Sequence, residues 1–149
     1  MITEIMIDTF IDKITDSEKV FILEDKNGIA FTDSLFFNDE NNAPIAVICF
    51  WSNFDVAQQN CVSGWEDYMV REVCLVTFIE DYLIQIYNDS LIVGINFNEK
   101  MEGHEADPLD LTASILNVLK KKNKQLEFEY FKNMKDLTDQ VQNLINLSK

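Results

Sequence analysis

One continuous apolar run, Ile45 to Trp51 behind Pro44, constrains the fold of this chain more than any other feature. A strand covered on both faces has such a run, whereas a strand with one wet face alternates apolar and polar residues. The run is much shorter than the roughly 20 apolar residues that cross a bilayer as a helix. We therefore predict a central strand at residues 44–51, buried between two layers of the protein.

Periodicity along the rest of the chain predicts further helices and strands. Apolar residues at helical spacing predict a helix over residues 3–16. Asn27 and Gly28 suit the positive φ angles of a tight turn, and they predict a hairpin of residues 20–23 with residues 29–32. Further helices are predicted at residues 53–62, 77–87 and 108–119, further strands at residues 70–75 and 91–97, and a polar loop at residues 38–43.

Three of the predicted helices begin at residues that favour capping. The Ser52 hydroxyl stands just before the predicted helix 53–62. Thr77 and Glu80 form the T-x-x-E pattern of a capping box. Asp107 precedes Pro108, and proline suits the first helical position because the hydrogen bond that it lacks is not made there anyway.

This order predicts a single compact α+β domain, in which helices pack on a mixed or mostly antiparallel sheet, followed by a C-terminal amphipathic helix. After residues 120–124, which are rich in lysine, apolar residues recur at steps of four and three, as in the a and d positions of a coiled coil. They are Leu126, Tyr130, Met134, Leu137, Val141 and Leu144. This stripe docks on the rest of the chain in the simpler interpretation, or forms a homodimer through residues 126–147.

We divide the chain into an acidic α+β domain, residues 1–118, and a basic helical extension, residues 119–149. The net charge is −14; residues 1–118 contain 22 Asp and Glu against 5 Lys and Arg, and residues 119–149 contain 4 against 7. Nucleic-acid binding requires a basic face that displaces counterions. We therefore expect no direct binding to nucleic acids, and no binding to membranes. The run of lysines in residues 120–124 is most often a solvated helix face or a linker in proteins, and pairing with the acidic domain is a further interpretation.

The familiar signatures of catalytic and cofactor sites are missing from the sequence. His104 is the only histidine, which excludes a metal site built on imidazoles. Four glycines cannot build a dinucleotide or phosphate loop. Cys49, Cys61 and Cys74 form no CxxC pair, and we expect them to be reduced core thiols of a cytoplasmic protein. We predict no catalytic residue, no metal ligand and no cofactor.

Several segments together resemble one bacterial family. They are Val20 to Gly28, Cys49 to Ala57, Trp65-Glu66, Thr77 to Glu80, Asp89 to Phe97 and Pro108 to Leu111. In this order they resemble the family known as domain of unknown function 2750, over about residues 5–118. The extension, residues 119–149, lies outside the resemblance. The resemblance implies a small α+β bacterial protein without an established activity, and it transfers no catalytic residue.

Acidic composition without a catalytic signature favours a protein that binds a basic protein, and most concretely an immunity protein that neutralises a basic toxin. The candidate contact residues are Asp8, Asp12, Asp16, Asp39, Glu40, Trp65, Glu66 and Asp67. Trp65 is included because tryptophan is enriched at binding hot spots, although a core position is its simpler interpretation. The alternatives are a homodimeric structural or regulatory module, an enzyme with an unrecognised site, and a mimic of DNA.

Overall fold

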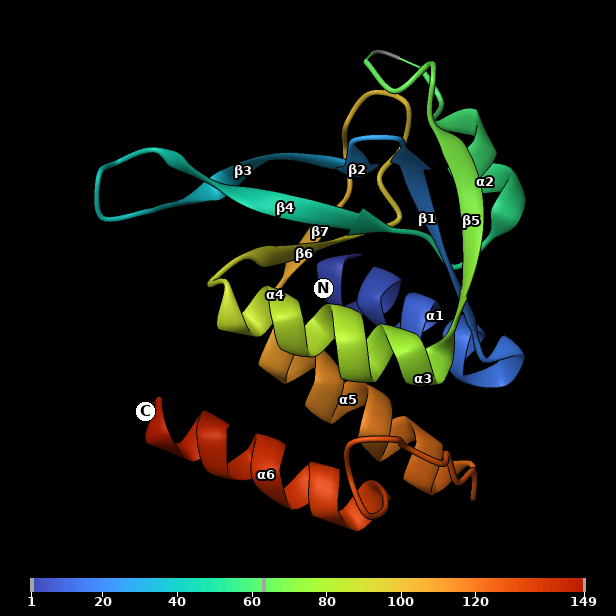
Figure 1. Cartoon of the computed structure of the whole chain (residues 1–149), viewed down its shortest axis with the longest axis vertical. Helices are drawn as coiled ribbons and strands as arrows, with labels where there is room; N and C mark the ends of the chain where they lie inside the picture. Colours follow the sequence, from blue (N-terminus) through green and yellow to red (C-terminus); the bar gives the residue numbers. More distant parts are fainter. Residues whose placement is uncertain (1, 63, 149) are drawn as a thin grey trace.

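Two small sheets with helices on both sides make up the computed structural model, which describes residues 2–62 and 64–148 (Figure 1). The elements are α1 (Ile2–Ser17), β1 (Lys19–Asp25), β2 (Gly28–Ile29), β3 (Phe31–Asn38), β4 (Pro44–Phe50), α2 (Phe54–Gln59), β5 (Met69–Cys74), α3 (Leu75–Thr77), the π-helix η1 (Phe78–Leu83), α4 (Ile84–Asn88), β6 (Ile92–Ile95), β7 (His104–Ala106), α5 (Pro108–Lys121) and α6 (Met134–Leu147). The predicted α+β class is confirmed. None of the described helices has the length and apolar character that a bilayer crossing requires.

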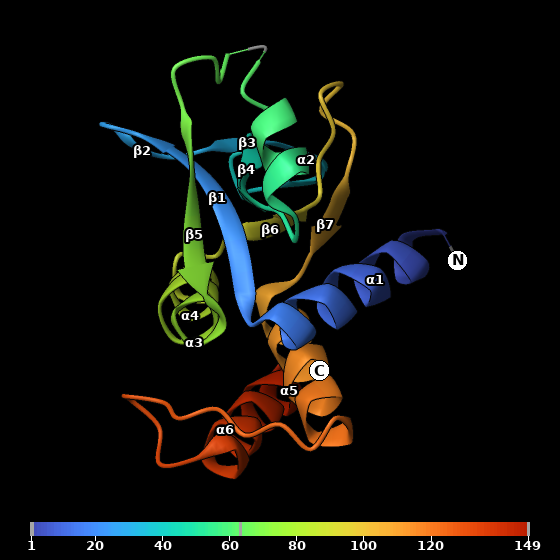
Figure 2. The ribbon, with the colours of Figure 1, turned by 90° about the vertical axis from the view of Figure 1, so that its right-hand side faces the viewer.

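The strands form an antiparallel sheet of order β2-β1-β5 and a mixed sheet of order β3-β4-β6-β7, in which β4 and β6 run parallel. Phe21 and Trp51 exchange backbone hydrogen bonds of 2.8 and 2.9 Å, and these bonds join β1 to the end of β4. The two sheets therefore meet at one corner instead of standing apart. Figure 2 shows α2 on one side of this corner and α3–α6 at the opposite end of the molecule.

Strand β4 confirms the prediction of a central strand covered on both faces. Phe50 faces the larger core, which α1, α5 and the segment from α3 to α4 build with it. Val47, Cys49 and Trp51 face a smaller core, which also contains Trp65. The side chains that face the two cores here are fully buried: Val47, Cys49, Phe50 and Trp51. Because neighbouring side chains of a strand point to opposite faces, one apolar run serves both cores.

The predicted hairpin of residues 20–23 with residues 29–32 is confirmed only near its turn. Glu24 pairs with Ile29, and Gly28 has a φ of 137° that favours glycine. At Ala30 the chain crosses between the sheets: its amide donates to Leu23 in β1, and its carbonyl accepts from Cys49 in β4. The strand that follows, β3, runs on to Asn38 in the other sheet, so the prediction ended it too early.

Two of the three predicted helix caps are wrong. The cap of α2 is Asn53, whose Oδ1 accepts hydrogen bonds from the amides of Asp55 and Val56 at 2.8 and 3.2 Å, and not Ser52. Thr77 lies inside a helix that already begins at Leu75, so no capping box forms there. The third prediction is confirmed, since the Asp107 carboxylate accepts from the Asp110 amide at 2.9 Å.

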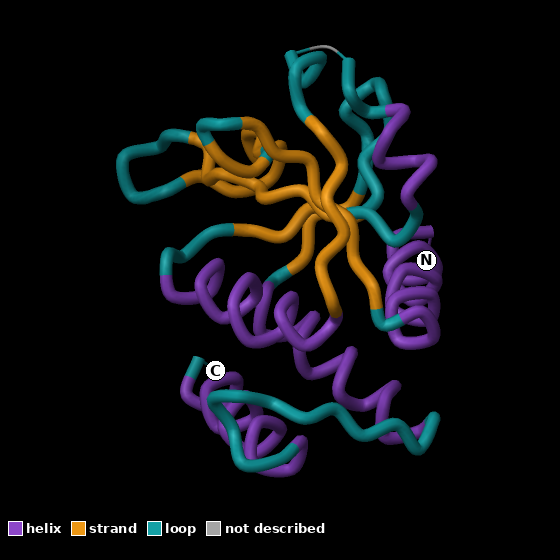
Figure 3. The backbone as a smooth tube through the Cα atoms, turned by 45° about the vertical axis from the view of Figure 1, so that its right-hand side comes forward, coloured by secondary structure: helices purple, strands orange, loops and turns teal. Residues whose placement is uncertain are grey.

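The C-terminal stripe packs on the rest of the chain, as the simpler interpretation had it, but as a shorter helix than predicted. Residues 125–133 are not helical, and α6 begins only at Met134. Leu137 and Val141 are buried in the larger core against α5. Tyr130 leaves the stripe and is 66% exposed. Figure 3 shows α6 and its preceding loop as the outermost layer, beyond α5.

A buried carboxylate, Glu80, holds the loop that precedes α6. Glu80 lies in the π-helix, where one extra residue per turn often marks a local departure that serves a specific contact. Its two oxygens accept hydrogen bonds from the amides of Glu129 and Tyr130 at 3.1 and 2.8 Å. A carboxylate that accepts two backbone bonds is well satisfied, so Glu80 fastens the extension to the domain.

Lysines after α5 fasten the extension at a second place. The ammonium of Lys122 lies 2.9 Å from a carboxylate oxygen of Asp12 and 2.8 Å from one of Asp16. Lys124 donates to the carbonyl of Thr15 at 2.7 Å and lies 3.4 Å from the Glu18 carboxylate. Of the interpretations that the lysine-rich stretch allowed, Lys122 and Lys124 follow the pairing with the acidic domain, at the C-terminal end of α1.

We predict that Glu80→Ala destabilises the protein by about 1–3 kcal/mol, because the amides of residues 129 and 130 lose their acceptor in a half-buried place. Urea unfolding measures the loss, and limited proteolysis reports whether residues 125–133 become accessible. The matched control is Glu127→Ala, which removes an exposed carboxylate from the same loop. Equal stability of the two variants would show that the Glu80 contacts contribute nothing.

Candidate functional site

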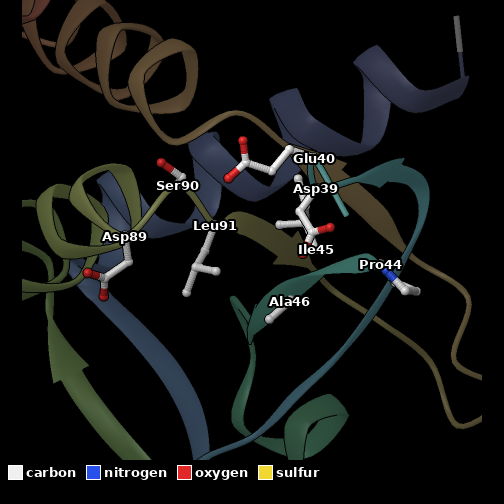
Figure 4. A pocket seen from close by; sticks show the side chains of 8 residues that line it. All are labelled: Asp39, Glu40, Pro44, Ile45, Ala46, Asp89, Ser90 and Leu91. Atoms are coloured by element: carbon white, nitrogen blue, oxygen red, sulfur yellow. The ribbon is translucent and has the colours of Figure 1, made fainter. Parts of the chain in front are cut away.

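One groove of the structure lies between the β3–β4 hairpin and the start of β6 (Figure 4). It has a volume of about 400 Å³. It is lined by Asp39, Glu40, Pro44, Ile45, Ala46, Asp89, Ser90 and Leu91. Three of these residues are carboxylates, and four present apolar side chains, so the groove offers an apolar surface with an acidic rim. We call it the acidic groove.

Local turns fix the rim of the acidic groove. Asp39 accepts hydrogen bonds from the amides of Asn41 and Ala43 at 2.8 and 3.0 Å, which closes the hairpin loop onto itself. At the opposite rim, Asp89 follows the last turn of α4 and accepts from the Gln85 amide group at 3.0 Å. Each aspartate keeps a second oxygen for other partners. Figure 4 shows Leu91 and Ala46 between Asp89 and the hairpin residues.

A second groove, of about 430 Å³, lies between α1 and α5. Its lining combines Asp8 and Asp12 of α1 with Lys121 of α5. Asp12 is already paired with Lys122, as described above. This groove therefore brings acids and a lysine together, and its charge is largely compensated within the chain.

The structure distributes the eight predicted contact residues over three places. Asp39 and Glu40 meet in the acidic groove, and Asp8, Asp12 and Asp16 lie along the exposed side of α1. Glu66 and Asp67 are exposed in the loop before β5, beside Trp65. The prediction for Trp65 needs correction: it is 7% exposed and packs edge-to-face on Trp51 at 6.1 Å, so it anchors the smaller core.

Sequence reasoning missed a group of exposed apolar residues on one strand. Phe31, Leu35, Phe36 and Phe37 of β3 are between 50% and 79% exposed. The signal was present in Leu35-Phe36-Phe37, directly before the polar loop. Successive side chains of a strand alternate between its faces, so three large apolar neighbours cannot all enter one core. The prediction ended the strand at residue 32 and left this triplet without a place.

The single histidine and the three cysteines lie outside both grooves. His104 lies on β7, where its Nε2 is 2.8 Å from the sulfur of Met6. Burial, and to a lesser degree the charge of Glu105, raises the pKa of the Cys49 thiol to about 12. The expectation of three core thiols holds only for Cys49, because Cys61 is half-buried and Cys74 is exposed. Within the described residues no three His, Cys, Asp or Glu side chains are placed to hold a metal ion.

A comparison with known protein families confirms the resemblance that the sequence segments indicated. The sequence profile of the family described as Protein of unknown function (DUF2750) matches residues 7–115. The chain belongs to the DUF2750 family. No curated protein matches the sequence. All residues of the acidic groove fall inside the DUF2750 match, whereas α6 and the lysines at 120–124 lie beyond it. Glu80 is therefore a residue of the DUF2750 region that holds a segment outside that region.

Lys122 lowers the pKa of one carboxyl group on α1, that of Asp16. Its hydrogen bond and its charge hold the pKa of Asp16 below the ordinary value. Burial works against the Lys122 ammonium, but the hydrogen bonds to Asp12 and Asp16 outweigh it and raise the pKa of the lysine. A carboxyl group whose pKa is lowered by folding stabilises the folded state at any pH above its pKa in the unfolded chain, which is about 3.9 for Asp. This stabilisation is lost as the pH falls through the lowered pKa of the folded state.

We predict that Lys122→Ala raises the pKa of Asp16 towards its ordinary value, since the main cause of the shift is removed. An NMR titration of the side-chain carboxyl carbons measures it. Lys121→Ala is the matched control, because Lys121 lines the second groove and has no ion pair among the described residues. An unchanged Asp16 titration in Lys122→Ala, or an equal shift in both variants, contradicts the assignment of the shift to Lys122.

Proposed function

We propose that this DUF2750 protein is a non-catalytic protein of a bacterial cell that binds a basic protein, and specifically an immunity protein that neutralises a basic toxin. The observation that carries the proposal is the unpaired rim of the acidic groove. Within the described parts of the chain, Asp39, Glu40 and Asp89 form no salt bridge. Lys122 and Lys124, which could have neutralised them, are held at α1.

The composition of the groove suits the side chains that a basic protein presents. A lysine or arginine has an apolar stem and a charged end, so it can lie along apolar surface while its charge meets a carboxylate. Ile45, Ala46 and Leu91 offer such a surface beside Asp39, Glu40 and Asp89. The groove can therefore receive a cationic side chain, with its stem on these apolar residues and its charge at a carboxylate.

The overall charge supports the same kind of partner. With a formal net charge of −14, the protein attracts a basic protein over a distance and accelerates their encounter. A toxin that acts on nucleic acids needs a basic surface for its own substrate. An acidic immunity protein would compete for that surface and would repel the nucleic acid, which makes this kind of toxin the most specific version of the proposal.

The alternative of a homodimer through residues 126–147 receives less support. Met134, Leu137 and Val141, the centre of the stripe, are already buried within their own chain. A dimer through them would require α6 to leave α5 and the Glu80 contacts to break. Two alternatives remain, an enzyme and a mimic of DNA, and no arrangement of side chains described above favours either of them over an immunity protein.

We predict that the protein, co-expressed with the product of the neighbouring gene in its native strain, forms a complex whose association slows as salt is added. The triple variant Asp39→Asn, Glu40→Gln and Asp89→Asn should associate several-fold more slowly, because it removes the acidic rim without changing side-chain shape. Surface plasmon resonance at two salt concentrations measures both effects. The control, Glu99→Gln with Glu127→Gln, removes exposed carboxylates elsewhere.

Two results would count against the proposal. Failure to capture any basic protein, with the folded wild-type chain in excess, removes the partner. A complex that forms equally fast at both salt concentrations removes the electrostatic basis. An equal loss in the triple variant and in the control would keep the basic partner and would remove only the acidic groove as its contact.

A further inference from the structure

An exposed apolar strip lies beside the acidic groove. It consists of Phe31, Leu35, Phe36 and Phe37, which are 56%, 79%, 74% and 50% exposed. Single exposed apolar residues are common on proteins, but several together on one short strand commonly mark a contact with another molecule. We call these four residues the β3 strip.

The strip is continuous with the acidic groove. β3 is an edge strand of its sheet and pairs with β4. Phe31 pairs with Ile48, and Asp33 pairs with Ala46, which lines the groove. Figure 1 shows the loop end of the β3–β4 hairpin extending away from the layer of helices. The pairing is irregular between Asp33 and Asn38, so Leu35, Phe36 and Phe37 lie between the paired part of β3 and the loop that carries Asp39 and Glu40. The strip therefore adjoins the hairpin side of the groove.

Hydrogen bonds hold the backbone of the strip in place. The buried hydroxyl of Ser34 accepts from the amides of Phe36 and Phe37 at 3.1 and 2.9 Å, and it donates to Glu105 of β7. The second oxygen of Glu105 accepts from the Leu35 amide at 2.9 Å. A surface whose backbone is already fixed loses little conformational entropy when a partner binds.

We propose that the β3 strip and the acidic groove together form the docking surface for one kind of partner, a basic protein segment that carries apolar side chains between lysines or arginines. This inference rests on the function proposed above and assigns its main contact. The strip receives the apolar side chains, and Asp39, Glu40 and Asp89 receive the flanking cations. Buried apolar anchors surrounded by polar contacts are the usual anatomy of such interfaces.

Charge decides between this partner and a second copy of the chain. Two strips that met face to face would bring Asp33, Asp39 and Glu40 of one copy close to the same residues of the other. None of these carboxylates has a salt bridge among the described residues. Like charges that meet in an interface oppose association, whereas a basic segment relieves the same charges.

The test uses the full chain and two synthetic peptides of equal length and charge, one alternating lysine with leucine and the other lysine with serine. NMR chemical-shift mapping follows each titration. We expect the lysine–leucine peptide to shift signals of residues 31–37 and of the acidic groove, and to bind at least about tenfold more tightly than the lysine–serine peptide. The double variant Leu35→Ser and Phe36→Ser should lose about tenfold of this affinity.

Met69→Ser is the matched control, because Met69 is also 74% exposed but lies on β5 in the other sheet. It should bind the lysine–leucine peptide like the wild type. The spectra of the free variants report whether each keeps its fold. If the double variant is not folded, the single variant Leu35→Ser replaces it, since this side chain is the most exposed of the strip.

Several results would overturn the inference. The lysine–leucine peptide could fail to bind, or the two peptides could bind equally well. The chemical-shift changes could be confined to α1 or to the loop before β5, or the double variant could bind with the affinity of the wild type. A wild-type dimer in light scattering that the double variant abolishes would assign the strip to a second copy instead. A co-expressed partner that the double variant binds as tightly as the wild type would overturn this inference and leave the proposed function standing. If the peptide binds at the strip but no cellular partner is captured, the proposed function is overturned and the strip remains a peptide-binding surface.

Discussion

The burial of β4 on both faces is the constraint on which the rest of the fold depends. Its alternate side chains enter two different cores, so the strand must have a layer of protein on each side. The parallel neighbour β6 lies close against it at Gly94, where a Cβ atom would come within 2.8 Å of a Val47 methyl carbon. The glycine in the stretch from Asp89 to Phe97, which supported the family resemblance, thus has a physical reason in the packing of β6 on β4.

Features set by a few neighbouring residues could be predicted from the sequence, and features set by distant contacts could not. The apolar run of β4 and the Asp107 cap depend on local pattern and local hydrogen bonds, and both were predicted. At α2, however, Ser52 and Asn53 are both good caps, and the local pattern does not choose between them. Ser52 makes a distant contact instead, since its amide donates to Asn96, just beyond β6. Glu80 has the right spacing for a capping box, but its partners lie about fifty positions along the chain.

The acidic groove was predictable only in part for the same reason. Asp39 and Glu40 stood out because they lie in a polar loop of an acidic chain, but Asp89 joins them only through the parallel pairing of β4 with β6. Composition likewise left open whether the basic extension would meet acids, and which ones. The structure places Lys122 and Lys124 at the end of α1, more than one hundred positions away in sequence, and the hairpin keeps its negative charge.

The extension and the β3 strip show two different treatments of apolar surface in one chain. The apolar side of α5 is covered by α6, which is tied down by Glu80 and by the two lysines. The β3 strip has no such cover, although its side chains are as large. If low exposure of apolar surface were the only requirement, polar residues at Leu35 and Phe36 would meet it without loss of core packing, since neither belongs to a core. Three adjacent apolar residues on a rigid, acid-flanked edge strand are better explained by a partner that covers them, and this is the reason to look for the contact there first.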